Sequence, residues 1–143
     1  PEDFTRGTFQ PLIPDASADP ASVEVLLVCS GRITWDLMVE RGKREGSEKF
    51  AIARVEQLYP QPIEELRAEL ARYPNLKAVR WVQDEPANMG PWPHYALNVW
   101  PLLDQTVTLA GRPACASPSV GTLKRHVEEQ KQVLDAAFAP AEG

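Results

Sequence analysis

Small polar residues and basic residues lie close together around residue 117, in a pattern that suits phosphate binding. Ser117 is a good helix N-cap and Pro118 suits the first helical position, so a helix is predicted to begin there. The N-terminus of a helix presents free backbone N–H groups and a partial positive charge, which favour a phosphate. Ser119 adds a hydroxyl, and Arg112 and Lys124 add full positive charges. These residues are candidates for binding an anion such as the phosphate of a nucleotide.

A purely structural interpretation of this segment stays open beside the first. On that interpretation Ser117 only caps its own helix, while Lys124 and Arg125 pair with Glu128 and Glu129 one helical turn later. The sequence is compatible with both interpretations.

Residues that could act as acids, bases or nucleophiles do not form a catalytic motif. Asp84 and Glu85 are adjacent carboxylates, but successive residues of a strand face opposite sides and do not easily share one substrate. His94 follows a proline-rich turn, and His126 lies beside the apolar stripe of a predicted helix. Neither G-x-S-x-G nor H-E-x-x-H occurs. The chain alone is therefore predicted to be inactive, with no catalytic residues.

One tryptophan is a candidate for an interface between subunits. Trp92 lies between Pro91 and Pro93, which excludes it from a strand and from the middle of a helix. It is therefore expected on a stiff loop, which loses little entropy when it docks. Trp92 and the nearby Asn88 are the candidate interface residues, and packing of Trp92 in the core of the protein is the alternative.

The elements that would position these residues are predicted from hydrophobic runs and periodicity. Residues 23–30 are β-branched and apolar, which indicates a buried parallel strand. Ile63, Leu66, Leu70 and Tyr73 recur at helical spacing. The predicted strands span residues 23–30, 50–55, 78–83 and 106–111, and the predicted helices span residues 33–43, 63–73, 94–103 and 120–138. This alternation requires right-handed parallel crossovers, so the predicted fold is α/β, a three-layer sandwich with a small, mostly parallel sheet.

The predicted sheet brings several polar loops to one edge. Ligands of open parallel sheets collect at the carboxyl ends of the strands. Residues 29–32, 85–90 and 111–119 all follow predicted strands and are expected to meet there.

Residues 1–22 are predicted to be an extended N-terminal arm or linker before the α/β domain at 23–143. Phe4 and Phe9 of this arm suggest that it packs on a neighbouring surface.

Composition excludes several classes of protein. The chain has 143 residues, of which 43% are hydrophobic and 24% charged, as expected for one globular domain. A formal net charge of −5 argues against nonspecific nucleic-acid binding. Cys29 and Cys115 provide neither a disulfide framework nor a zinc site, so no metal site and a reducing, cytoplasmic compartment are predicted. No apolar run reaches the roughly 20 residues of a membrane span. The chain has no initiator Met and no signal peptide, and is expected to be a fragment or a processed product.

Three long motifs resemble those of one enzyme family. They are Arg-Val-Glu-Gln-Leu-Tyr-Pro-Gln-Pro at 54–62, Trp-Val-Gln-Asp-Glu-Pro-Ala-Asn-Met-Gly-Pro-Trp at 81–92, and Ala-Gly-Arg-Pro-Ala-Cys-Ala-Ser-Pro-Ser-Val-Gly at 110–121. In this order they resemble the last domain of the thiamine-diphosphate-dependent first component of 2-oxoglutarate dehydrogenase, which is similar to the C-terminal domain of transketolases. The resemblance covers nearly the whole chain.

The resemblance implies a role that composition and periodicity do not show. The full-length enzyme decarboxylates 2-oxoglutarate in the citric acid cycle and passes the succinyl group to the lipoyl carrier of an acyltransferase component, in the bacterial cytoplasm. Its thiamine diphosphate and magnesium bind between the two preceding domains, so this chain alone is expected to bind neither. The last domain supports the homodimer and in some relatives forms part of an allosteric site for acetyl-CoA or AMP, to which an arginine at the position of Arg112 contributes. Relatives that bind acetyl-CoA often carry a second arginine where this sequence has Gly111. A free-standing nucleotide- or coenzyme-A-binding regulatory module without catalysis is the alternative.

Overall fold

Strand β2 (Val25–Cys29) is buried along its whole length because helices cover both faces of the sheet to which it belongs. The computed structural model describes residues 7–141. Alternate side chains of β2 pack into two separate hydrophobic clusters, one on each face. In chain order the other elements are β1 (Leu12–Ile13), α1 (Ile33–Arg41), β3 (Phe50–Val55), α2 (Ile63–Ala71), β4 (Ala78–Pro86), α3 (Trp92–Asn98), β5 (Val107–Arg112) and α4 (Leu123–Ala137), with 3₁₀ turns at Ser47–Lys49 and Trp100–Leu103.

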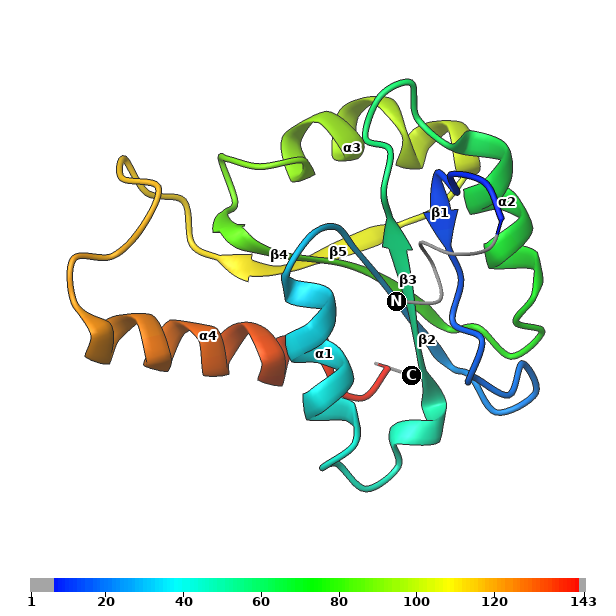
Figure 1. Cartoon of the computed structure of the whole chain (residues 1–143), viewed down its shortest axis with the longest axis horizontal. Coiled ribbons are helices and arrows are strands. Elements are labelled where there is room, and N and C mark those ends of the chain that lie inside the picture. Colours follow the sequence, from blue (N-terminus) through cyan, green and yellow to red (C-terminus); the bar gives the residue numbers. More distant parts are fainter. Residues whose placement is uncertain (1–6, 142–143) are drawn as a thin grey trace.

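The sheet has the order β1-β3-β2-β4-β5. Strands β2 to β5 pair in parallel, and β1 pairs with β3 in antiparallel orientation. Helices α1 and α4 lie on one face and α2 and α3 on the other (Figure 1). The predicted three-layer α/β fold with a mostly parallel sheet is therefore confirmed. No helix among residues 7–141 has the length and apolar character needed to cross a bilayer.

The second half of the N-terminal arm joins the folded unit. Leu12 and Ile13 pair with Val55 and Arg54 at the edge of the sheet. Asp15 follows, and only 5% of its surface is exposed. Phe9 is 67% exposed, whereas Phe4 lies outside the described residues. Within residues 7–22 the chain thus contributes a short strand at the edge of the sheet, which the sequence did not indicate.

The prediction that Ser117 caps the last helix is wrong. Helix α4 begins at Leu123, and its N-cap is Thr122, whose hydroxyl accepts a hydrogen bond from the backbone N–H of Arg125 at 3.4 Å. Ser117 instead lies in the loop between β5 and α4, where its hydroxyl donates to the carbonyl of Ser119 at 2.9 Å. Thr122 and Ser117 are both good caps by residue type. Gly121 disfavours a helix that passes through it, which leaves Thr122 as the working cap.

The helix predicted at residues 94–103 is divided into two pieces. Helix α3 ends at Asn98 and a 3₁₀ turn follows at Trp100–Leu103, because Pro101 has no N–H to continue an α-helix. Trp92 is the first residue of α3 and not part of a loop, so the prediction of a stiff loop is corrected. Its side chain is half-buried and packs against the cluster between the sheet and helices α2 and α3.

Candidate functional site

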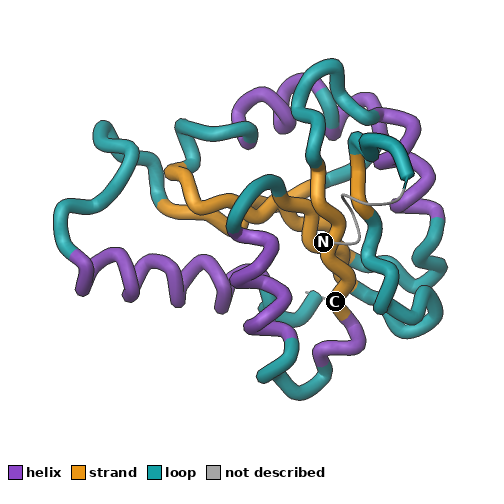
Figure 2. Tube along the Cα trace, viewed as in Figure 1, coloured by secondary structure: helices purple, strands orange, loops and turns teal. Residues whose placement is uncertain are grey.

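A small cavity lies at the carboxyl end of β5, beneath the loop that leads to α4. Figure 2 shows this loop extending away from the sheet before the chain turns back into the helix. The cavity has a volume of about 70 Å³, which suits a group the size of a phosphate but not a whole cofactor, whose pockets measure roughly 300–1,000 Å³. Its polar lining comes from β5, the loop and α4, and consists of Arg112, Cys115, Ser117, Ser119, Arg125 and Glu129.

Arg112 forms the buried floor of this cavity, with 6% of its surface exposed. Its Nη2 donates to Oε1 of Gln130 at 3.1 Å and lies 3.1 Å from Nδ1 of His126. Its Nε is buried and has no hydrogen-bond acceptor among the described residues. The guanidinium is therefore held in place through Nη2, whereas the N–H at Nε has no acceptor among the described residues.

Glu129 lies between Arg112 and a second arginine, Arg125. One carboxylate oxygen is 3.7 Å from Nε of Arg112, and the other accepts from Nε of Arg125 at 2.8 Å. The Glu129 side chain is 12% exposed, whereas that of Arg125 is 66% exposed. The cavity thus combines two positive charges and one negative charge, for a net charge of +1.

Asn88 fastens the loop after β4 to the loop after β5. Its side-chain nitrogen donates to the carbonyl of Cys115 at 3.0 Å, and its side-chain oxygen accepts from the N–H of Cys115 at 3.0 Å. The N–H of Ala87 donates to the carbonyl of Arg112 at 2.9 Å. These bonds hold the mouth of the cavity against the end of the sheet.

The turn after β2 and the carboxyl end of β4 meet at the same edge, as the topology predicts. Arg32 forms ion pairs with Asp36 at 3.1 Å and with Asp84 at 3.4 Å. Gln130 of α4 donates to Asp36 at 3.1 Å and to Asp84 at 2.9 Å. Since Gln130 also accepts from Arg112, one side chain links this crevice to the cavity at β5.

Cys29 ends β2 near this edge but is not an exposed nucleophile. Burial raises the pKa of its thiol to about 11, and its sulfur lies 3.3 Å from the hydroxyl of Thr34. The thiol therefore stays protonated near neutral pH. Among residues 7–141, no three His, Cys, Asp or Glu side chains gather closely enough to hold a metal ion.

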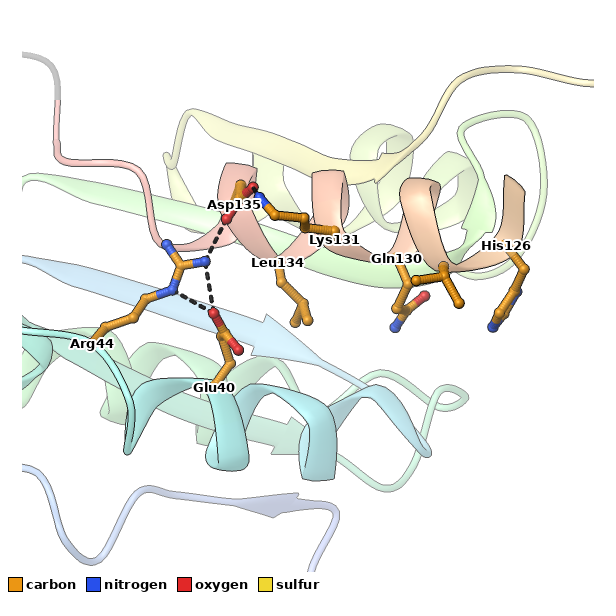
Figure 3. A pocket seen from close by; sticks show the side chains of 8 residues that line it. Glu40, Arg44, His126, Gln130, Lys131, Leu134 and Asp135 are labelled. Atoms are coloured by element: carbon orange, nitrogen blue, oxygen red, sulfur yellow. Dashed lines mark hydrogen bonds and ion pairs between the residues drawn. The ribbon is translucent and has the colours of Figure 1, made fainter. Parts of the chain in front are cut away.

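A wider groove of about 500 Å³ runs between α1 and α4. Figure 3 shows Arg44, in the segment that follows α1, pointing toward Glu40 and Asp135, with ion-pair distances of 2.8 and 2.5 Å. Lys131 also pairs with Asp135, at 2.5 Å. Because the charges that line this groove already pair with one another, the groove is a weaker candidate for binding an ion than the cavity at β5.

Residues 1–138 match the sequence model of the family described as 2-oxoglutarate dehydrogenase C-terminal. The chain belongs to this family. Curated relatives named 2-oxoglutarate dehydrogenase E1 component include those of Cupriavidus necator, 43% identical over 99% of this chain, and Azotobacter vinelandii, 43% identical over 96%. A 2-oxoglutarate dehydrogenase E1/E2 component of Corynebacterium glutamicum is 40% identical over 96%. The matches cover 15%, 15% and 12% of these proteins, so this chain spans a small part of their length. The family predicted from the sequence motifs is confirmed.

A solved structure supports the fold of this 2-oxoglutarate dehydrogenase C-terminal domain. It is described as a split gene transketolase, inactive beta4 tetramer, and it matches with a TM-score of 0.65 over 94% of this chain and 45% of that chain. The sequence identity is 14%, so the likeness concerns the fold alone. The predicted similarity to the C-terminal domain of transketolases is thereby confirmed.

The structure brings some of the predicted site residues of this 2-oxoglutarate dehydrogenase C-terminal domain together and leaves others apart. Arg112, Ser117 and Ser119 line one cavity. Lys124 is exposed on the first turn of α4 and is not among the lining residues. Trp92 is half-buried against the protein's own core.

Sequence reasoning missed the residues of α4 that hold Arg112. The ion pair between Arg125 and Glu129, which belongs to the purely structural interpretation of this segment, is present, but the contact of Glu129 with Arg112 was not predicted. Three residues of α4 lie three, four or seven positions before the buried Val133: Gln130, Glu129 and His126. At this helical spacing they share the face of α4 that packs on the sheet. That spacing is the signal that would have revealed them.

Proposed function

We propose that this chain is the non-catalytic C-terminal part of a thiamine-diphosphate-dependent 2-oxoglutarate dehydrogenase E1 component. The complete enzyme would decarboxylate 2-oxoglutarate and pass the succinyl group to the lipoyl carrier of the acyltransferase component, in the bacterial cytoplasm. The observation that carries this proposal is the match to the C-terminal family over residues 1–138, within relatives of which the chain covers 15%. Thiamine diphosphate and magnesium would bind to the preceding domains of that enzyme, and only a group the size of a phosphate would enter the cavity of about 70 Å³ at β5.

The first role of the domain in such an enzyme is to brace its assembly. Leu123 and Val127 of α4 are 78% and 58% exposed, and Leu97 of α3 is 77% exposed. Exposed apolar side chains on a folded domain favour packing against a further surface. We place the preceding domains of the same enzyme against the exposed side chains of α4, and we keep Trp92 and Asn88 as candidate residues of the homodimer interface.

One preparation of the chain tests this role. In an assay with 2-oxoglutarate, thiamine diphosphate, magnesium and an artificial electron acceptor, we expect no turnover, and turnover by these 143 residues would refute the proposal. In sedimentation velocity the chain should be monomeric, because the preceding domains, which would complete the homodimer interface, are absent from this preparation. Self-association that Trp92→Ala abolishes would instead identify an assembly domain that acts on its own.

The second proposed role is allosteric binding of a nucleotide or coenzyme A at the cavity beside Arg112. The support is the buried Nε of Arg112, which has no hydrogen-bond acceptor in the described part of the chain, together with the second guanidinium of Arg125. Ser117 and Ser119 border the same cavity. A phosphate group would accept from both arginines, which form strong charge-assisted hydrogen bonds with such anions. Gly111 provides no second buried charge on β5, so AMP is the first ligand to test and acetyl-CoA the second.

Substituting Arg112 tests this site. Titration with AMP, coenzyme A and acetyl-CoA, followed by tryptophan fluorescence, should give saturable binding in the parent chain. Arg112→Gln should weaken binding about tenfold or more, because it removes a buried positive charge that contacts the phosphate. Arg67→Gln is the matched control, since Arg67 is exposed on α2. Flat titrations of the parent, or equal affinities in parent and Arg112→Gln, would remove the proposed site.

A further inference from the structure

Glu129 occupies a place in the cavity where an anion would be expected to bind. Its two carboxylate oxygens face two different guanidiniums, that of Arg112 at 3.7 Å and that of Arg125 at 2.8 Å. With 12% of its side chain exposed, the carboxylate is largely removed from water. A phosphate seated between the two arginines would meet this negative charge directly.

Helix stability does not explain why a carboxylate lies there. The helix dipole stabilises a negative charge only in the first turn of a helix. Glu129 lies in the middle of α4 and does not benefit from it. The pair with Arg125 has the basic residue on the N-terminal side, which is the weaker of the two orientations at this spacing. Arg125 is 66% exposed, so the ion pair contributes little to stability.

The contact with Arg112 is also incomplete. The buried Nε of Arg112 has no hydrogen-bond acceptor among residues 7–141, although the Glu129 carboxylate is only 3.7 Å away. A buried N–H without an acceptor is costly, so an oxygen placed nearer than that of Glu129 would be favoured. The Arg125 side chain is largely exposed, so its guanidinium can turn toward a new partner. The cavity is therefore arranged so that an incoming anion can replace Glu129.

We infer that Glu129 is a built-in counter-anion of the Arg112–Arg125 cavity, which an incoming phosphate ester must displace. This inference rests on the allosteric site proposed above. Glu129 lowers the affinity of the cavity for every anion, so that only an anion with strong bonds to both guanidiniums, such as a doubly charged phosphate, binds appreciably, whereas chloride or acetate does not. The carboxylate also keeps the guanidiniums of Arg112 and Arg125 from being unpaired when no ligand is bound.

Neutralising Glu129 tests the inference. In calorimetric titrations with AMP and with inorganic pyrophosphate, Glu129→Gln should bind about tenfold more tightly than the parent, because a negative charge near the ligand is removed. The salt dependence of binding should become steeper as the net charge of the cavity rises, which a merely structural role of Glu129 would not change. Glu129→Asp, which withdraws the carboxylate by one methylene, should lie between the two and serves as a second variant if Glu129→Gln is poorly folded. Glu128→Gln is the matched control, since Glu128 is exposed on the same helix.

The outcomes separate this inference from the site on which it rests. Tighter binding by Glu129→Gln than by the parent that is lost in the double variant Arg112→Gln/Glu129→Gln supports both. Binding by the parent with equal or lower affinity in Glu129→Gln overturns the role of Glu129 and leaves the site standing. No binding by parent, Glu129→Gln or Glu129→Asp removes the site, and the inference with it.

Discussion

Replacing Asp15 by alanine should lower the free energy of unfolding by about 2 to 4 kcal/mol, because it breaks a buried ion pair and leaves donors without an acceptor. The Asp15 carboxylate accepts from the backbone N–H of Ser17 and of Ile52, each at 3.0 Å, and forms an ion pair with Arg41. Arg41 also donates to the carbonyl of Phe50 at 3.3 Å. This cluster joins the N-terminal arm, α1 and β3. Since Arg41 keeps 19% of its side chain exposed, the loss stays below that of a fully buried pair.

The contribution of Asp15 should depend on pH in a defined direction. Burial alone would raise the pKa of this carboxyl, but hydrogen bonds from Ser17, Arg41 and the N–H of Ile52, with the charge of Arg41, outweigh burial and hold the pKa below its ordinary value of 3.8. A carboxyl with a lowered folded-state pKa stabilises the fold above its unfolded pKa, and this stability is lost as pH falls through the folded pKa. The difference in unfolding free energy between parent and Asp15→Ala should therefore be constant near neutral pH and shrink below about pH 4.

Asp19→Ala is the matched control for this experiment. Asp19 makes the same kind of local turn, accepting from the N–H of Ala21 at 3.2 Å and from the hydroxyl of Ser22 at 2.6 Å. It is exposed and has no ion pair among the described residues, so its substitution should leave urea unfolding unchanged. Equal losses for Asp15→Ala and Asp19→Ala would show that the turn, and not the buried pair, holds the arm.

The same cluster shows which parts of the fold the sequence predicts. Strand β2 was predictable because five consecutive apolar residues are buried on both faces, and α2 because its apolar residues recur at helical spacing. Strand β1 was not, since two residues between prolines carry no period. Strand β1 pairs with β3, and the ion pair of Asp15 with Arg41, 26 residues away, fastens the segment that follows it; no local pattern encodes such contacts.

The candidate site was predictable to a similar extent. Arg112, Ser117 and Ser119 are close in sequence and follow the end of one strand, so their proximity needed no tertiary information. The position of Glu129 relative to Arg112 depends on where α4 begins, because each residue of shift turns a helix by about 100°. The predicted start at Ser117 was wrong, since α4 begins after Thr122, so the position of Glu129 could not be derived from the sequence.

The second large effect is expected at Gln83, which the sequence analysis did not single out. Its side chain is 2% exposed and bonds on every side. Its oxygen accepts from Nε1 of Trp81 at 2.9 Å and from the N–H of Trp92 at 3.0 Å. Its nitrogen donates to the carbonyls of Pro86 at 3.1 Å and Met89 at 2.8 Å. One side chain thus supports the whole turn that leads from β4 to α3.

The turn between β4 and α3 is tightly packed around Gln83 at Gly90. Gly90 has a φ of +66°, and a Cβ at that position would lie 3.1 Å from the side chain of Glu85 and 3.2 Å from Oε1 of Gln83. The close approach of the backbone to Gln83 therefore requires glycine. Asn88 lies within the same turn and fastens it to Cys115, so disorder at Gln83 would reach the mouth of the cavity.

Gln83→Leu should lower the free energy of unfolding by about 2 to 4 kcal/mol, because the buried N–H groups of Trp81 and Trp92 lose their acceptor. Gln83→Glu should be no better, since it restores the acceptor but turns its second oxygen toward carbonyl groups. Thermal unfolding measures both, and faster amide hydrogen exchange in residues 86–92 and 113–119 would show that the loss spreads from the turn to the cavity. Gln132→Leu, the same substitution at an exposed position of α4, should change neither quantity. If Gln83→Leu is as stable as the parent, or exchange rises only in residues 86–92, Gln83 does not organise the cavity.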